Sequence, residues 1–102
     1  MAYEIEWAES GVTSLVDTIE YIARDSPSYA AALAIRADRA AMSLAEFPDR
    51  GRRVSEFGDP AVREIMVDSY RLIYQVRMTK VTLLAFVHKA RDLSILLGNG
   101  SQ

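Results

Sequence analysis

Three apolar segments in the second half of the chain are separated by only two residues each, and this spacing strongly limits the possible folds. The segments span residues 62–67, 70–77 and 80–88, with DS and MT between them. Two-residue connections join antiparallel strands, whereas parallel strands need a crossover of about a dozen residues or more. We therefore predict a three-stranded antiparallel meander over residues 62–88.

The residues before this meander carry the patterns of one strand and a first helix. Residues 3–7, YEIEW, alternate apolar and acidic side chains, which is typical of a strand with one buried face. From about residue 9 to residue 24 the apolar side chains instead recur at intervals of three and four residues, which indicates an amphipathic helix. Ser10 is the candidate N-cap of this helix.

A second helix follows after a short break. Ser26 can accept a hydrogen bond from a free amide at its start, and Pro27 suits the first position because proline has no amide hydrogen to satisfy. The alanine-rich segment continues at helical spacing to about Phe47, where Pro48 ends it. Residues 48–60, PDRGRRVSEFGDP, have no periodicity and are predicted to form a loop. The two helices should form a hairpin.

These elements predict a single α+β domain over residues 1–102, with a core of about residues 3–93 and a frayed end at 98–102. An N-terminal strand and a helical hairpin precede the meander, and the helices should pack on one face of the sheet and leave the other partly open. In strand 70–77, alternation assigns the side chains to the two faces. The face under the helices should carry Tyr70, Leu72, Tyr74 and Val76, and the open face Arg71, Gln75 and Arg77.

The composition excludes several classes of site. The chain has no cysteine, so it has no disulfides or thiolate metal sites, and its single histidine, His88, cannot supply a metal cage alone. We therefore expect no metal and no cofactor. The N-terminal residues lack the basic stretch and apolar run of a signal peptide, and no apolar run approaches the roughly 20 residues that span a membrane. The expected location is the cytoplasm.

Opposite charges are concentrated in the two halves of the chain. Residues 1–50 contain nine acidic and four basic side chains, a balance of −5, and residues 51–102 contain five acidic and eight basic ones, a balance of +3. This asymmetry fits two solvated surfaces of opposite sign, or a basic surface that meets an acidic or phosphate-bearing partner. The basic sequence DRGRR at residues 49–53 is open to the same two interpretations, a solvated turn or a phosphate contact.

Four stretches of the chain carry a family resemblance. In order, they are SLVDTIEYIARDSP, LAEFPDRGRRVSE, VREIMVDSYRLIYQV and LLAFVHKARDL. Together they resemble the ParE/RelE superfamily of bacterial type II toxins, most closely the ParE branch, over about residues 3–93. The resemblance implies a small toxin encoded beside an antitoxin whose C-terminal segment wraps and silences it. It also implies one of two activities: RelE-like members cleave messenger RNA on the ribosome, and ParE-like members poison DNA gyrase.

Cleavage of RNA through the ribose 2′-hydroxyl needs a base, an acid and cations at the phosphate. By the resemblance, Arg71 and Arg91 match two phosphate-stabilising arginines of the ribonuclease members, and His88 would be the only proton carrier near neutral pH. The chain departs from those members at Glu64 and Met66, where cations would be useful, and it has no tyrosine or histidine after Arg91. If the protein is a ribonuclease, its catalytic set is therefore Arg71, His88 and Arg91.

The ParE-like interpretation assigns no catalytic residues, because such a toxin is not itself an enzyme. It implies a cognate ParD-like antitoxin and DNA gyrase as partners, nucleic acid contacted only indirectly, and no membrane. The candidate contacts with target or antitoxin are Arg63, Arg71, His88 and Arg91, the arginines acting as charge-assisted donors. We hypothesise that an acidic antitoxin segment crosses the open face and competes for Arg71 and Arg91. A degenerate, non-toxic module that binds only an antitoxin is a further alternative.

Structural roles compete with these assignments. Arg71 could instead pair with Glu64 or Asp68 across a hairpin, and His88 could hydrogen-bond a backbone carbonyl. Two aromatic residues at alternate strand positions are expected in the core, Trp7 and Tyr74. Four residues near the C-terminus are too apolar for a free tail and are predicted to dock on the toxin, the antitoxin or the target: Leu93, Ile95, Leu96 and Leu97.

Overall fold

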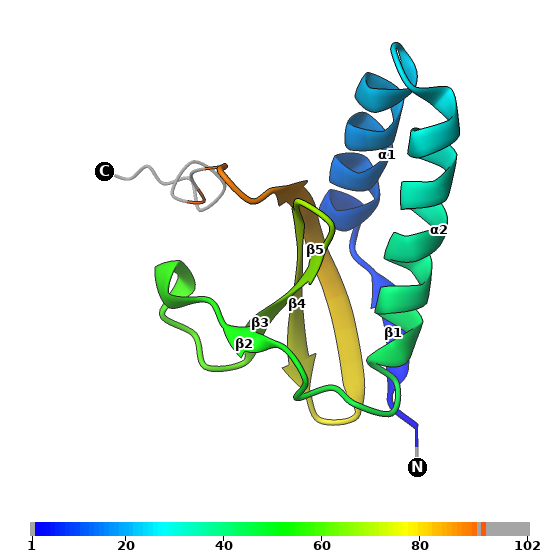
Figure 1. Ribbon diagram of the computed structural model, residues 1–102. Coiled ribbons are helices and arrows are strands. Elements are labelled where there is room, and N and C mark those ends of the chain that lie inside the picture. The colour runs from blue at the N-terminus through cyan, green and yellow to red at the C-terminus, as the bar shows by residue number, and fades with distance from the viewer. Residues whose placement is uncertain (1, 92, 94–102) are drawn as a thin grey trace.

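Two helices pack against a five-stranded sheet in the computed structural model, which describes residues 2–91 and 93 (Figure 1). In this part of the chain, neither helix combines the length and the apolarity that a membrane crossing requires. The elements in chain order are β1 (Glu4–Trp7), α1 (Glu9–Ala23), α2 (Pro27–Ser43), β2 (Arg52–Arg53), the 3₁₀ turn η1 (Ser55–Phe57), β3 (Val62–Val67), β4 (Tyr70–Arg77) and β5 (Lys80–His88).

The strands form one mixed sheet in the order β1-β5-β4-β3-β2. β3, β4 and β5 pair antiparallel and have the predicted bounds, so the predicted meander is confirmed. β1 lies parallel to β5, with Glu4 opposite Lys80 and Trp7 opposite Leu83. A parallel pair needs a long connection, and here both helices and the rest of the sheet separate the two strands. The predicted α+β class is confirmed as well.

Four local predictions were wrong. α2 ends at Ser43 rather than near Phe47, because the amide hydrogen bonds shift there from i−4 to i−3 spacing and the chain continues as a turn. The segment predicted as a loop contains β2 and η1. The N-cap of α1 is Ala8 rather than Ser10, and Ser26, which does lie at the N-cap of α2, makes no side-chain cap bond.

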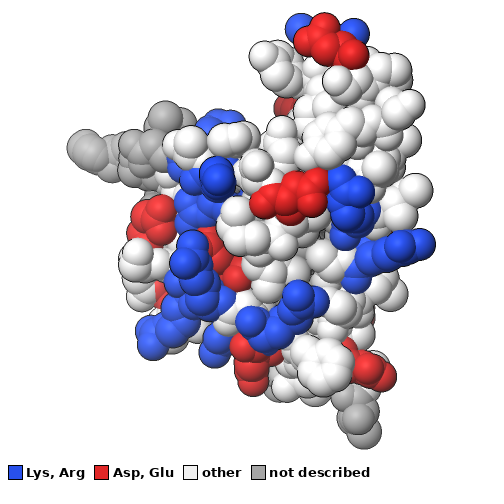
Figure 2. Space-filling view, viewed as in Figure 1, with Lys and Arg blue, Asp and Glu red and all other residues white. Residues whose placement is uncertain are grey.

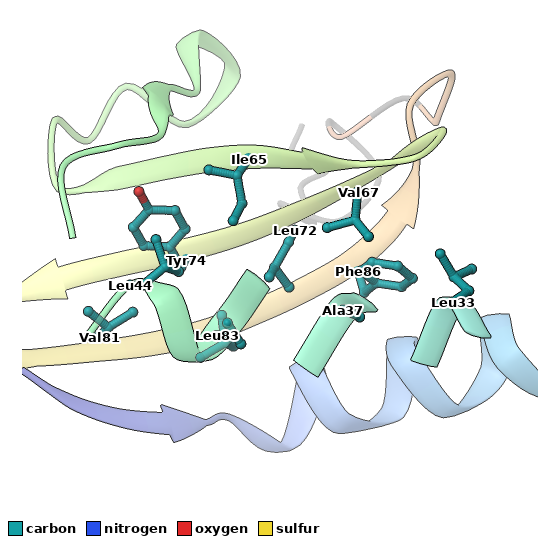
Figure 3. Close-up of a cluster of buried hydrophobic side chains, with 11 residues drawn as sticks. Leu33, Ala37, Leu44, Ile65, Val67, Leu72, Tyr74, Val81, Leu83 and Phe86 are labelled. Atoms are coloured by element: carbon teal, nitrogen blue, oxygen red, sulfur yellow. The ribbon is translucent and has the colours of Figure 1, made fainter. Parts of the chain in front are cut away.

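The main core lies between the helices and one face of the sheet (Figures 1 and 3). Leu72 and Tyr74 of β4 are fully buried there, and Tyr70 and Val76 pack against them partly buried, as the alternation predicts. Trp7 packs against the same cluster while partly exposed. The buried members of the cluster are Leu33, Ala37, Ala41, Leu44, Ile65, Val67, Leu72, Tyr74, Val81, Leu83 and Phe86.

The opposite face of the sheet was predicted to be partly open, and the structure shows that a second, smaller core covers part of it. Residues around η1 fold over it, because Val54 is buried and Phe57 packs beside it. Leu93 is fully buried there, as predicted, whereas Ile95, Leu96 and Leu97 lie outside the described residues. The buried members of this second core are Val54, Val62, Ile73, Ala85, Val87 and Leu93.

Hydroxyl groups of α1 cover the edge of β5 beyond the point where β1 ends. Ser10 Oγ donates to the Leu84 carbonyl at 2.8 Å, and Thr18 Oγ1 donates to the Phe86 carbonyl at 3.3 Å. Between them, Ser14 Oγ accepts from the Phe86 amide at 2.8 Å. The three residues recur every fourth position, so they share one helix face. They satisfy backbone groups that a neighbouring strand would otherwise bind.

Candidate functional site

Arg71 lies near the start of β4, on the face turned away from the helices. Its Nε donates to Glu64 Oε1 at 2.5 Å, and its Nη1 and Nη2 each lie 3.5 Å from a carboxylate oxygen of Glu56. Only 9% of its side chain is exposed, so the prediction of a solvent-facing arginine was wrong. The alternative of an ion pair with Glu64 is confirmed, and Asp68 binds Arg36 instead.

Glu64 is the centre of this ion-pair network. Its side chain is only 4% exposed, and its second oxygen, Oε2, accepts from Arg52 Nε at 2.7 Å. Burial is the largest single effect and lowers the pKa of the Arg71 guanidinium, but the hydrogen bonds and negative charges of Glu64 and Glu56 together raise it by more, so its net pKa shift is upward. Arg71 therefore stays charged, and its charge is balanced from within the chain.

The network forms one wall of a basic cleft with a volume of about 620 Å³. β2 supplies Arg52 and Arg53 to the lining, and Lys89 comes from the residue after β5. The charged residues that line the cleft are four cations, Arg52, Arg53, Arg71 and Lys89, and two carboxylates, Glu56 and Glu64. Positive charge is therefore in excess by two among the described lining residues.

The other predicted site residues lie elsewhere. Arg63 is opposite Tyr74, on the helix-covered face of the sheet, and donates to the Gly51 carbonyl at 2.7 Å. The hydrogen bond that the structure gives His88 is to an amide rather than to a carbonyl: its Nδ1 accepts from the Ala90 N–H at 3.1 Å. Arg91 is exposed and lines two grooves between α1 and the end of β5, one of which it shares with His88.

The structure therefore does not bring the ribonuclease candidates together. Arg71 is paired with Val87 across the sheet, so its side chain leaves on the same face as that of Val87. The next residue, His88, leaves on the opposite face, where its ring meets Tyr70 edge-on at 5.4 Å. Arg71 and Arg91 also line different clefts. A base, an acid and two phosphate-binding cations do not converge on one point.

A second basic surface borders the outer edge of β3. β2 pairs only with Arg63 and Glu64, so residues 65–67 have no backbone partner on that side among the described residues. Two grooves of about 380 and 320 Å³ follow this edge, with Met66 exposed in both. Figure 2 shows Lys and Arg side chains across this side of the molecule, over β2, β3 and part of α2. The arginines that line the two grooves are Arg36, Arg39, Arg50 and Arg52.

The polar contacts of two residues, Tyr74 and Asp68, hold this basic edge in place. The buried Tyr74 hydroxyl donates to the Pro48 carbonyl at 2.8 Å and accepts from the Gly51 amide at 3.0 Å, which fixes the segment that carries Arg50. Burial raises the pKa of Tyr74, so the hydroxyl keeps its proton. At the β3–β4 turn, Asp68 binds Arg36, and this bond lowers the pKa of the carboxyl group.

Sequence reasoning singled out Arg50 and Arg52 within DRGRR but missed the two arginines that α2 contributes to this edge. Arg36 and Arg39 belong to the half of the chain whose charge balance is −5, so the excess of acids hid them. The available signal was local, because Arg36 and Arg39 are three residues apart and therefore share one face of α2. In the described residues, no three Asp, Glu or His side chains are grouped so that they could hold a metal ion.

Comparison with known proteins identifies the family. The family model described as "ParE toxin of type II toxin-antitoxin system, parDE" matches residues 5–93. The chain belongs to the ParE toxin family. This ParE-family toxin is also 33% identical over 89 residues to Toxin RelE2 of Caulobacter vibrioides, which covers 86% of the chain and 97% of the relative.

Two solved structures share the fold of this ParE-family toxin. A chain of the chromosomal ParDE system from P. aeruginosa superposes with a TM-score of 0.71 at 12% identity, covering 85% of this chain and 96% of that one. A chain of the RelBE2 toxin-antitoxin complex from Mycobacterium tuberculosis superposes with a TM-score of 0.59 at 19% identity, covering 86% and 99%. At these identities the likeness concerns the fold, and it bears out the ParE/RelE architecture.

Proposed function

We propose that this ParE-family toxin inhibits DNA gyrase and does not cleave RNA itself. The match to the ParE toxin family model supports gyrase as the target. The observation that argues against RNA cleavage is the separation of Arg71 from His88, whose side chains leave opposite faces of the sheet. General acid-base catalysis needs the proton-transfer group and the charge-stabilising groups around one reacting phosphate. Arg71 is moreover neutralised by Glu64, which leaves little of its charge for a transition state.

RelE-like ribonuclease activity is the second candidate, because the relative from Caulobacter vibrioides carries the name Toxin RelE2. On that alternative, His88 and Arg91 would act together from the groove that they share. Arg71 would then have a structural role only.

The two candidates differ in a direct assay of the purified toxin. We expect the toxin to inhibit supercoiling of relaxed plasmid by gyrase and to increase linear DNA from trapped cleavage complexes. Messenger RNA in a translating ribosome mixture should stay intact. Cleaved transcripts with normal supercoiling would contradict the proposal and support the ribonuclease, and no effect in either assay would support the non-toxic binding module.

We further propose that a cognate, ParD-like antitoxin docks an acidic segment along the basic edge of β3. An extended segment can pair with the unpartnered backbone of residues 65–67, while its carboxylates meet Arg39 and Arg50. On the opposite side of the sheet, the part of β5 that extends beyond β1 does not offer such a site, because hydroxyl groups of α1 already bind it. The sequence suggested instead that an acidic antitoxin segment competes for Arg71 and Arg91. We prefer the edge of β3, because Arg71 and Arg91 line different clefts.

Reversing one charge on this edge should weaken the antitoxin complex. We expect Arg39→Glu to raise the dissociation constant about tenfold, equal to about 1.4 kcal/mol, and to reduce its dependence on salt. Isothermal titration calorimetry at two salt concentrations would measure both. Arg24→Glu is the matched control, because Arg24 is also an exposed arginine and lies at the end of the other helix. Equal effects of the two substitutions would argue against docking at β3.

A further inference from the structure

The outer face of α2 carries two exposed apolar side chains with a pair of opposite charges between them. Ile35 is 54% exposed and Met42 is 55% exposed. They are seven residues apart, which is about two helical turns, so they share one face of the helix. Asp38 and Arg39 lie between them on this face and are exposed as well. Neither forms an ion pair with another described side chain.

No described segment of the chain covers this face. α2 forms the outer margin of the helical layer in Figure 1, and its buried residues lie on the opposite side of the helix. These buried residues are Ala30, Leu33, Ala37 and Ala41. A single exposed apolar residue needs no explanation, whereas two on one face together with unpaired charges are the elements of a protein interface.

This face is complementary to itself when two copies of α2 pack antiparallel. A two-fold axis through the midpoint between Asp38 and Arg39 places Ile35 opposite the partner subunit's Met42. The same axis places Asp38 opposite the partner subunit's Arg39. Because the axis relates the two subunits, each of these contacts occurs twice. A parallel arrangement would instead place each charge opposite its own copy, and like charges across an interface repel each other.

We propose that this toxin associates with a second copy of itself through the outer faces of two antiparallel α2 helices. The two apolar pairs exclude water from the contact, and the two ion pairs near the axis set the antiparallel orientation. The contact involves one helix from each subunit, so the interface is small and the dimer should be weak.

The dimer would also cover a residue of the basic edge. Arg39 lines the groove beside Met66 and Val67, at the edge to which we assign the antitoxin segment. Antitoxin binding should therefore separate the two toxin copies. This consequence rests on the proposed antitoxin site, whereas the dimer itself depends on neither the antitoxin nor gyrase.

Sedimentation equilibrium of the purified toxin over a wide range of concentrations tests the proposal. We expect a reversible equilibrium between monomer and dimer. Ile35→Glu should raise the dimer dissociation constant at least about tenfold, because it places a charge among the apolar side chains of the contact. Met78→Glu is the matched control, since Met78 is 93% exposed between β4 and β5, and it should change the constant less than about twofold. Both positions are exposed, so circular dichroism should show an unchanged fold.

A charge swap tests the pairing of Asp38 with Arg39. Asp38→Arg alone should weaken the dimer about tenfold, because it places like charges opposite each other near the axis. Asp38→Arg combined with Arg39→Asp exchanges the two charges and should restore the affinity to within about threefold of that of the unmodified toxin. A general effect of net charge on association would not produce this rescue.

The orientation of the helices is tested by cross-linking, because the chain has no cysteine of its own. In a mixture of the Ile35→Cys and Met42→Cys variants, a short bis-maleimide should join one variant to the other more than it joins either variant to itself. Four results would each overturn the proposal: a toxin that stays monomeric at every concentration, a dimer that Ile35→Glu leaves intact, a charge swap as disruptive as Asp38→Arg alone, or cross-linking of each variant mainly to itself.

Discussion

Replacing Glu64 with alanine should lower the free energy of unfolding by about 3–5 kcal/mol, because it leaves a buried guanidinium without its main partner. Arg71 is only 9% exposed, so water can replace little of the interaction that its guanidinium loses. Its remaining carboxylate, Glu56, lies 3.5 Å away and makes only a stretched contact. Urea denaturation followed by circular dichroism would measure the loss.

A double substitution separates loss of the ion pair from loss of packing. Glu64→Leu combined with Arg71→Met removes both charges and keeps apolar volume at both positions, so it should recover most of the stability lost in Glu64→Ala. If Glu64→Ala lowered the free energy of unfolding by less than about 1 kcal/mol, which is typical of an exposed ion pair, the predicted importance of the Glu64–Arg71 pair would be contradicted.

Gly11→Ala should lower the free energy of unfolding by about 1–3 kcal/mol, although alanine is the better helix former by about 1 kcal/mol. Gly11 is the buried residue of α1 and lies where the helix crosses β5. An added Cβ would overlap the Leu83 carbonyl oxygen and would lie 3.3 Å from the Trp7 ring. Because the obstacle is backbone, the helix must move away from the sheet.

Thermal and urea unfolding of Gly11→Ala, compared with Glu20→Ala, would test this prediction. Glu20 is exposed on the same helix, so its substitution should change stability by less than about 0.5 kcal/mol. A Gly11→Ala variant more stable than the unmodified toxin would mean that the close approach of α1 to β5 does not exist.

The elements that were predicted correctly are those whose partners are close in sequence. Two-residue connections left β3, β4 and β5 no arrangement other than a meander, and alternation assigned Leu72 and Tyr74 to the buried face. β2 was missed because two residues cannot show a periodicity. The pairing of β1 with β5 was missed because it depends on how the whole chain closes.

The candidate site was predicted only in part, for a related reason. From the sequence, Arg71 could be a contact for a partner or one half of an ion pair. The alternation of side chains along a strand assigns Arg71 to a face of the sheet, but it does not decide between these two roles. The choice depends on Glu56, which comes from a segment with no regular pattern, and on the burial of Glu64. His88 and Arg71 seemed compatible with one active site until the strand register placed them on opposite faces.

By itself, the sequence determined the strand and helix periods, the antiparallel meander and the family to which the chain belongs. These properties depend on the order and spacing of residues within short stretches of the chain. Only the tertiary structure decided which charges are neutralised, which sheet edge has no backbone partner within the described part of the chain, and which basic residues share a cleft. The physical reason is that solvation and ion pairing depend on distances between segments far apart in the chain, and these distances exist only once the two layers have packed.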